Sequence, residues 1–391
     1  MYYDPYDVDI DNDPYPTWKR LRDEAPLYHN AEHGFYALSR FADVEAGLID
    51  WGTYSSAKGS VLELIKSGIE LPPGIVLFED PPLHDVHRGL MSRVFTPKAM
   101  SALEPRIREY CARSLDRFIG AGGFDVVEDL GAIVPMLVIG MLLGIPEADH
   151  MAAIEDLEGV RQGLDDAREG KAINVDAITS TFADYVEWRA ENLSDDLTTK
   201  LLTTEFEDET GATRCLSRTE VLLYINVLAG AGNETTRRLI GWTGQLLGDH
   251  PDQRRELAAD RSLLPNAIEE ILRYESPSPV QARLVTKDIE HHGQAVPEGS
   301  IMLLLNGSAN RDERHFEDAD RFDIHRRIDH HLAFGYGLHF CLGAALARME
   351  GRVVLDEVLT RFPDWEVDYD NAKLDHTSTT RGWLKLPIIT S

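Results

Sequence analysis

One cysteine lies in a sequence context that could hold a metal ion. The segment 334–343 reads Phe-Gly-Tyr-Gly-Leu-His-Phe-Cys-Leu-Gly and contains Cys341. Gly335 and Gly337 allow a tight turn because glycine adopts positive φ without strain, and the strong helix formers of 344–350 follow. Cys341 is therefore expected beside a helix N-terminus, where unpaired N–H groups and the helix dipole favour a thiolate and lower the thiol pKa. A fixed, hydrogen-bonded thiolate is a metal ligand, above all for haem iron.

The same residues are compatible with simpler interpretations. A lone cysteine in a glycine-rich loop is usually structural. Gly335 and Gly337 could begin a dinucleotide-binding loop, but Phe340 stands where a third glycine is needed. A zinc cluster would combine Cys341 with nearby histidines whose spacing fits no common zinc pattern, namely His330, His331 and His339.

The length of the matching segment favours haem ligation, because the loop resembles the haem-binding loop of the cytochrome P450 family. The matching residues are Phe334, Gly335, Gly337, His339, Cys341 and Gly343. The resemblance implies haem b (iron protoporphyrin IX) with Cys341 as its metal ligand, and it places Phe334, His339 and Gly343 against the cofactor. It also implies a single domain, 1–391, with a mainly α fold and a minor β lobe from about 1–60 and 278–310.

A histidine–arginine pair that follows two prolines could bind an anion. The prolines at 81–82 favour the start of a helix, and His84 and Arg88 are then four residues apart on one helical face. Such a pair can bind one carboxylate. In the family that the loop resembles, this pair holds a haem propionate, and Arg283 corresponds to a second propionate-binding arginine. His87 lies on a different face of this helix and has no assigned role.

A long, largely apolar segment is expected to form a helix that crosses the molecule. Ser217 and Glu220 form a capping-box pattern before the helical segment 221–247, which would be about 40 Å long at 1.5 Å per residue. Small residues at 229–232 allow a flat, bulky group to approach the backbone, and two glycines so close together predict a local distortion. A weak kink filled by a neighbouring helix is the simpler alternative.

The middle of this helix resembles the oxygen-binding motif of the same family at Ala231, Gly232, Glu234, Thr235 and Thr236. The resemblance implies that Ala231 and Gly232 lie against the haem. It also implies that Thr235 hydrogen-bonds to bound oxygen and that Glu234 helps to relay protons. Glu234 and Thr235 are therefore the predicted catalytic residues.

A second glutamate–arginine pair is expected to stabilise the cysteine loop. Glu270 and Arg273 are three residues apart on the predicted helix 266–274 and can pair locally. If exposed, such a pair would contribute little to stability. In the family that the sequence resembles, the pair is buried and joined by a later arginine, which corresponds to Arg326. The resemblance implies a structural network that fixes the loop carrying Cys341.

Apolar segments far apart in the sequence are candidates for a substrate pocket. The segment 55–80 is rich in Gly and Pro yet strongly apolar, so it is expected to be an irregular lid over a ligand site; an Ω-loop packed on its own side chains is the alternative. Residues that the resemblance places near the substrate are Val76, Leu77, Phe182, Ala231, Val280, Gln281 and Thr379. Capping of the pocket and packing in the core are equally compatible with Leu157, Val160, Leu164 and Ile178.

The composition disfavours several kinds of partner. The 391 residues carry a net charge of −28, which argues against nucleic acid and anionic membranes. Three cysteines are too few for a disulfide framework and indicate a reducing compartment, and the N-terminus has no signal-peptide pattern. The apolar segment 131–146 is shorter than the roughly 20 residues of a membrane span. A buried helix, no membrane anchor and a cytoplasmic location are therefore expected.

The resemblance implies a monooxygenase that uses dioxygen to hydroxylate a hydrophobic small molecule, such as a terpenoid, a steroid or a lipid-like compound. Electrons would come from a separate ferredoxin and ferredoxin reductase. The ferredoxin would dock on a basic group of residues, although a solvated face is the default for such a group: Arg93, Lys98, Arg106, Arg108 and Arg113. Two other functions stay open, a haem-thiolate peroxygenase or isomerase and a non-catalytic haem or ligand carrier.

Overall fold

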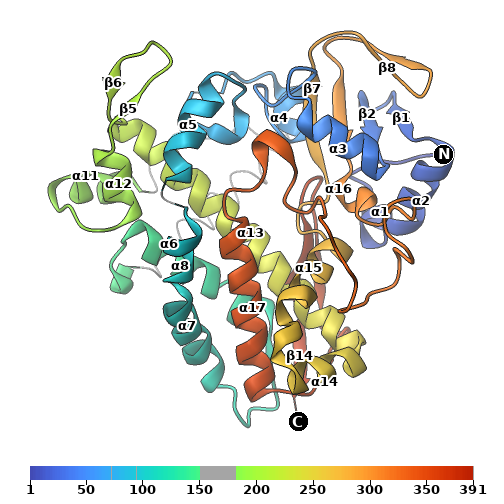
Figure 1. Ribbon diagram of the computed structural model, residues 1–391. Helices are drawn as coiled ribbons and strands as arrows, with labels where there is room; N and C mark the ends of the chain where they lie inside the picture. Colours follow the sequence, from blue (N-terminus) through green and yellow to red (C-terminus); the bar gives the residue numbers. More distant parts are fainter. Residues whose placement is uncertain (72, 94, 150–181, 391) are drawn as a thin grey trace.

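Helices form most of the regular secondary structure in the described part of the chain, and a small sheet lies at one side. The computed structural model describes residues 1–71, 73–93, 95–149 and 182–390. In Figure 1 the helices occupy the left and centre, and strands β1 (Leu27–Asn30), β2 (Phe35–Leu38) and β7 (Gln281–Val285) gather at the upper right, near the N-terminus. The predicted mainly helical fold with a minor β part is confirmed.

The largest sheet joins two distant parts of the sequence. Its strand order is β1-β2-β10-β7-β3, with β3 at Tyr54–Ser55 and β10 at Ile301–Leu304. β10 runs parallel to β2 and antiparallel to β7, so Met302 pairs with Tyr36 on one side and with Arg283 on the other. Every residue of the apolar β10 is buried, as expected for a central strand. This register positions Arg283 for the site described below.

The other strands form smaller sheets. Strands β11, β14 and β4 form one sheet, and β12 with β13, β5 with β6, and β8 with β9 form three hairpins. Their bounds are β4 Gly123–Asp125, β5 Phe206–Glu207, β6 Thr213–Arg214, β8 Ile289–His291, β9 Gln294–Val296, β11 Trp365–Val367, β12 Lys373–His376, β13 Arg381–Lys385 and β14 Pro387–Thr390.

The helical part is built around α13 (Arg218–Asp249) and α17 (Ala344–Arg361), which pack against each other. Among the neighbours in Figure 1, α7 and α15 pack on α17, and α8 packs on α13. The remaining α-helices are α1 Val8–Asn12, α2 Tyr15–Glu24, α3 Phe41–Ile49, α4 Leu62–Ser67, α5 Leu83–Ser92, α6 Pro97–Ser101, α7 Glu104–Asp116, α8 Val134–Leu143, α11 Ala183–Glu191, α12 Leu197–Thr203, α14 Pro251–Ala259, α15 Leu264–Tyr274 and α16 Asn306–Ala309. Short turns of other helical types are η1 Val76–Phe78, η2 Val127–Gly131, η3 Glu147–Asp149, η4 Arg261–Leu263 and η5 Gly337–His339.

The sequence determines the start of α13 as predicted. The Ser217 hydroxyl accepts the N–H of Glu220 at 3.2 Å, and the Glu220 carboxylate accepts the N–H of Ser217 at 2.7 Å, so the capping box is present. The helix is longer than the predicted 221–247, and it continues unbroken through the two glycines that predicted a distortion. Residues 238–244 are all buried, so this helix lies in the core.

The segment 55–80 is more regular than predicted. It contains α4 and the turn η1, so the expectation of an irregular loop is wrong in part. The apolar side chains that suggested a lid explain the difference, because Leu62 in α4 is buried in the core beneath the large sheet. Gly68 ends α4 with a φ of 65°, a conformation that favours glycine.

The longest apolar segment, 131–146, forms the buried helix α8, as predicted. Pro135 lies in the first turn of α8, where its missing N–H costs nothing. In the part of the chain that the structure describes, no helix has both the length and the apolar character needed to cross a membrane.

The cap of α13 leads to a stability prediction. Ser217→Ala removes the acceptor for the Glu220 N–H, and we expect it to lower the free energy of unfolding by about 1 kcal/mol. Chemical denaturation followed by circular dichroism measures this change. Thr203→Ala is the control, because its exposed hydroxyl donates only to the Thr199 carbonyl one turn earlier. Equal effects of the two substitutions would contradict the role assigned to the cap.

Candidate functional site

The loop that carries Cys341 is a tight turn between η5 and α17. The N–H of Cys341 donates to the Phe334 carbonyl at 2.9 Å and closes the loop. Gly335 and Gly337 both have a φ of 68°, as their predicted role requires. A Cβ atom at Gly337 would lie 3.1 Å from the Leu48 carbonyl oxygen, so the loop packs closely on the end of α3.

The electrostatic environment of Cys341 differs from the prediction. Burial raises the pKa of the Cys341 thiol, and this effect outweighs the Gly343 N–H and the guanidinium groups of Arg88 and Arg348, which lower it. The expectation of a lowered pKa is therefore wrong for the chain alone, because the loop removes the sulfur from water. A bound metal cation would supply the positive charge that keeps such a thiol deprotonated.

Four nitrogen-bearing side chains from three elements meet beside this loop. His84 and Arg88 come from α5, Arg283 from β7 and His339 from η5. The rings of His84 and His339 are 4.6 Å apart, and Arg88 donates to the carbonyl of Phe340 at 2.6 Å. The structure therefore brings His84, Arg88 and Arg283, which were predicted to face haem propionates, together with His339, which was predicted to lie against the cofactor. They are called the propionate cluster below.

The propionate cluster contains two arginines, with Asp85 3.3 Å from His84 and Asp80 near Arg283. Burial, with Arg283 and His84 as neighbours, lowers the pKa of His339 to about 3, and burial lowers the pKa of Arg283 to about 10. Among the described residues, the Nε2 atoms of His84 and His339 are buried without a hydrogen-bond partner. Anionic oxygens placed here would meet both the charge and the hydrogen-bonding requirement.

The middle of α13 opens to space on one side. Gly230 and Ala231 are exposed although the helix is buried further on, and nothing lies within 4 Å of a Cβ built at Gly230. Gly232 instead packs on α8, where a Cβ would be 2.8 Å from the Ile139 side chain. The Thr235 hydroxyl donates to the Ala231 carbonyl at 2.8 Å. A flat group can thus approach α13 at 230–231.

These features fit a haem. A partly buried thiol on a tight loop can bind iron. The unpaired nitrogens of the propionate cluster can bind two carboxylates, and the open face of α13 leaves room for a flat ring system. No group of three or more His, Cys, Asp or Glu that could hold a metal ion occurs among the described residues.

Glu234 is held by a partner that the sequence analysis missed. Arg238, one turn further along α13 and buried, donates to the carboxylates of both Glu234 and Asp375, and to the Gly382 carbonyl at 3.0 Å. The i,i+4 spacing of Glu234 and Arg238 was a usable signal. Asp375 in β12 could not be foreseen, because it is 137 residues away in the sequence.

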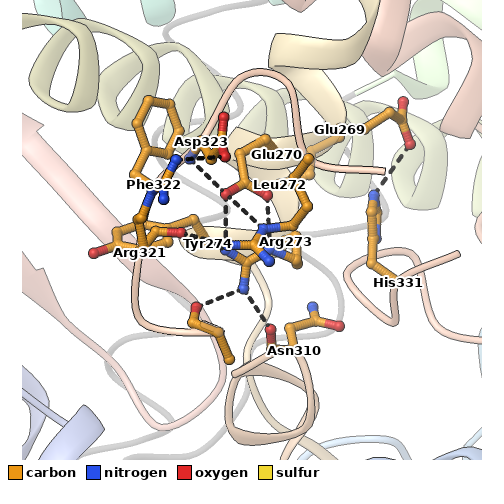
Figure 2. A network of polar contacts seen from close by, with 12 residues as sticks. Glu269, Glu270, Leu272, Arg273, Tyr274, Asn310, Arg321, Phe322, Asp323 and His331 are labelled. Atoms are coloured by element: carbon orange, nitrogen blue, oxygen red, sulfur yellow. Dashed lines mark hydrogen bonds and ion pairs between the residues drawn. The ribbon is translucent and has the colours of Figure 1, made fainter. Parts of the chain in front are cut away.

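The predicted structural network forms one buried hub. Figure 2 shows Glu270 between Arg273 and the segment 321–323. Glu270 accepts from Arg273 at 2.7 and 2.8 Å and from Arg326 at 3.2 Å. Arg273 also donates to the Asn310 carbonyl at 2.8 Å, and the Asn310 side chain accepts the N–H of Leu332 at 2.7 Å. The hub thus reaches the start of the cysteine loop.

A second connection to the loop was not predicted. Glu269 lies 3.2 Å from His331, as Figure 2 shows, and accepts from Arg348 of α17 at 2.6 Å. Although burial alone would raise it, these two partners lower the pKa of Glu269 to about 2. The Arg348 guanidinium lies 4.5 Å from the ring centre of Phe334. Helices α15 and α17 therefore hold the loop at both ends.

The predicted substrate-pocket residues lie in several surroundings. Val76 is buried and Leu77 is exposed in η1, and Phe182 packs in the core cluster that contains Tyr224 and Ala229 of α13. Val280 is buried next to the sheet, Gln281 accepts from Arg283 at 2.9 Å, and the buried Thr379 lies in the turn between β12 and β13. Outside the described residues lie Leu157, Val160, Leu164 and Ile178.

Comparisons with known proteins agree with this site. The family model for cytochrome P450 matches residues 166–388. Cytochrome P450 123 of Mycobacterium tuberculosis is 38% identical, covering 99% of this chain and 96% of that protein. The structure of cytochrome P450 CYP109Q5 from Chondromyces apiculatus superimposes with a TM-score of 0.88 at 32% identity, covering 100% and 98% of the two chains. CYP109E1 from Bacillus megaterium in complex with testosterone gives 0.84 at 29% identity, with coverage of 97% and 99%.

The fold and the matches define a haem-thiolate oxidoreductase. The chain belongs to the cytochrome P450 family, whose members are monooxygenases.

The hub leads to a second stability prediction. Glu270→Gln keeps the shape but leaves the buried Arg273 charge without its partner, so we expect a loss of about 3–5 kcal/mol in the free energy of unfolding. Thermal unfolding measured by calorimetry checks this loss. The matched control is Glu366→Gln, because Glu366 is exposed. A change no larger than that of the control would show that the hub does not hold the fold.

Proposed function

We propose that this cytochrome P450 binds haem b and hydroxylates a hydrophobic small molecule. The observation that carries the proposal is the placement of the Cys341 thiol, on its tight loop, beside two arginines and two histidines whose Nε2 atoms have no partner in the described part of the chain. In this assignment Cys341 is the iron ligand, and His84, Arg88, Arg283 and His339 bind the propionates. When bound, the haem supplies the activation of dioxygen and the transfer of one oxygen atom.

The residues of α13 act on the open side of the cofactor site. Ala231, with Gly230, leaves the backbone accessible, and the Thr235 hydroxyl can donate a hydrogen bond toward that side once it turns from the Ala231 carbonyl. Glu234 can hold a proton near Thr235, and Arg238 with Asp375 fixes the resting position of its carboxylate. We therefore assign Thr235 and Glu234 to proton delivery and Arg238 to the positioning of Glu234.

The residues predicted to line the pocket favour a hydrophobic substrate. The predicted pocket residues are mostly apolar, and no predicted pocket residue carries a positive charge that would bind a carboxylate. Structural relatives are described in complex with testosterone and with corticosterone, and another with hexadec-9Z-enoic acid ligated to acyl carrier protein. A terpenoid, steroid or lipid-like substrate is consistent with both observations.

The electron donor is proposed to be a ferredoxin that docks beside Phe340. Three of the predicted basic residues are already paired with carboxylates: Arg106 and Arg113 bind Glu147, and Arg108 binds Glu104, Asp356 and Glu357. Their net attraction for an acidic protein is therefore small. Arg93, Lys98 and Phe340 are exposed. Arg93 ends α5, whose Arg88 donates to the Phe340 carbonyl, and Lys98 lies in α6, which packs on α17. We propose a cytoplasmic location, because a ferredoxin partner and three cysteines that form no disulfide are both compatible with a reducing compartment.

The proposed function is tested by a visible spectrum of the purified, reduced protein with carbon monoxide. We expect the long-wavelength Soret band typical of thiolate ligation, because Cys341 is the only cysteine beside the propionate cluster in the described chain. Cys341→His should shift this band to the position of histidine ligation. A colourless protein, or an unchanged band in the variant, would refute the assignment. Turnover supported by peroxide but never by dioxygen and a reductase would favour the peroxygenase alternative.

The docking proposal predicts a charge-reversal effect. Lys98→Glu and Arg93→Glu should each slow reduction of the haem by a ferredoxin about tenfold at low salt, because electrostatic steering sets the association rate. Stopped-flow absorbance measures this rate. Arg255→Glu on the remote helix α14 changes the net charge equally and should leave the rate unchanged. Equal slowing by all three would indicate an effect of net charge alone.

A further inference from the structure

A buried polar cluster outside the assigned haem and oxygen sites lies between α5 and α13. His87 of α5, Glu79 of the preceding segment and Tyr224 of α13 are all more than nine-tenths buried. The Glu79 carboxylate lies 2.7 Å from His87 Nδ1 and accepts the N–H of Gly74 at 2.6 Å. The rings of His87 and Tyr224 meet edge to face at 5.9 Å. These three residues are called the polar anchor below.

Two atoms of the polar anchor have unused hydrogen-bonding capacity. In the described part of the chain, neither His87 Nε2 nor the Tyr224 hydroxyl has a hydrogen-bond partner, although both are buried. Leaving a polar atom buried and unpaired destabilises the folded protein. Two such atoms on touching rings therefore indicate a shared partner that is not part of the described chain.

The polar anchor lies at the end of the helix face that carries the oxygen site. Residues at i, i+4, i+7 and i+11 share one side of an α-helix, so Tyr224, Leu228, Ala231 and Thr235 form a continuous stripe on α13. Tyr224 is about 16 Å from Thr235 along the axis, at 1.5 Å per residue. The segment containing Gly74 lies against the same end of α13, where a Cβ at Gly74 would be 3.8 Å from Leu223.

The donor and acceptor pattern selects one functional group. Because His87 Nδ1 faces the Glu79 carboxylate, its N–H donates there, and Nε2 is left for a ligand. The Tyr224 hydroxyl can donate and accept. A ligand hydroxyl, which both donates and accepts, can pair with Nε2 and with Tyr224 at the same time. A methyl group satisfies neither atom, and a carboxylate would be repelled by Glu79.

We propose that Glu79, His87 and Tyr224 form a binding subsite for a hydroxyl group at the end of the substrate remote from the position that is oxidised. The proposal rests on the proposed function, because it assumes haem at Cys341 and a substrate lying along the Tyr224–Thr235 stripe. The substrate is then a hydrophobic alcohol. The distance between its hydroxyl group and the carbon that is oxidised determines the regiospecificity.

Alkylimidazoles test the subsite without knowledge of the substrate. Their imidazole ligates haem iron in the holoenzyme and gives a spectral binding constant, while the chain extends into the pocket. Two series of increasing chain length are compared, one ending in a methyl group and one in a hydroxyl. At the chain length that reaches Tyr224, the hydroxyl series should bind about tenfold more tightly, the size of one well-made hydrogen bond. An ω-carboxylate of that length should bind more weakly than the alcohol.

Variants assign the preference to the subsite. Tyr224→Phe removes one oxygen atom and should abolish most of the tenfold preference, and His87→Leu should do the same. Tyr274→Phe is the matched control, because its hydroxyl donates to the Asp320 carbonyl near the surface, and it should keep the full preference. Ligation without any hydroxyl preference, or a preference that survives in both anchor variants, would overturn the subsite. Failure of either series to ligate iron would instead refute the proposed haem function, and the subsite with it.

Discussion

A cluster of nitrogen-bearing side chains beside the cysteine loop is the constraint on which the rest of this structure depends. Arg88, Arg283, His84 and His339 converge from a helix, a strand and a loop, and burial is the main cause of the lowered pKa values of His339 and Arg283. Two arginines, with two histidine Nε2 atoms that have no partner among the described residues, form a site suited to an anion. The central claim is that the two propionates of a haem provide that anion and align the porphyrin over Cys341.

The surrounding structure holds the propionate cluster and the Cys341 thiol in fixed relative positions. The Glu270 hub connects α15 to the segment before the loop, and Glu269 connects the same helix to His331 and Arg348. Arg88 donates to the Phe340 carbonyl at 2.6 Å, so α5 also contacts the loop. A buried ion pair is not in itself evidence of stability, and its value here is to fix one geometry.

Local spacing made much of the site predictable. Cys341 with its glycines, the four-residue step from His84 to Arg88, and the capping box of α13 are all encoded within a few residues, so periodicity and turn chemistry suffice. Arg283 and Arg326 required resemblance to a family, because nothing in their immediate sequence indicates the partner. The structure then placed both beside the expected groups.

The remaining features of the site depend on contacts between distant segments or on burial, and neither can be predicted from local sequence. Arg238 pairs with Asp375 across 137 residues, and Arg108 pairs with Asp356 and Glu357 of α17. The thiol pKa was mispredicted because the helix N-terminus was visible in the sequence and the loss of water was not. His87 had no predicted role for the same reason. Its contacts with Glu79 and Tyr224 join residues that are not neighbours in the sequence, so they are visible only in the structure.

The most direct test of the central claim compares the affinity of the haem-free protein for haem with its affinity for haem dimethyl ester, in which both propionates are neutral. The account predicts that the ester binds about 100-fold more weakly, because charge-assisted hydrogen bonds to the four side chains are lost. Arg283→Met should reduce this difference. Equal affinities for the two porphyrins would contradict the account.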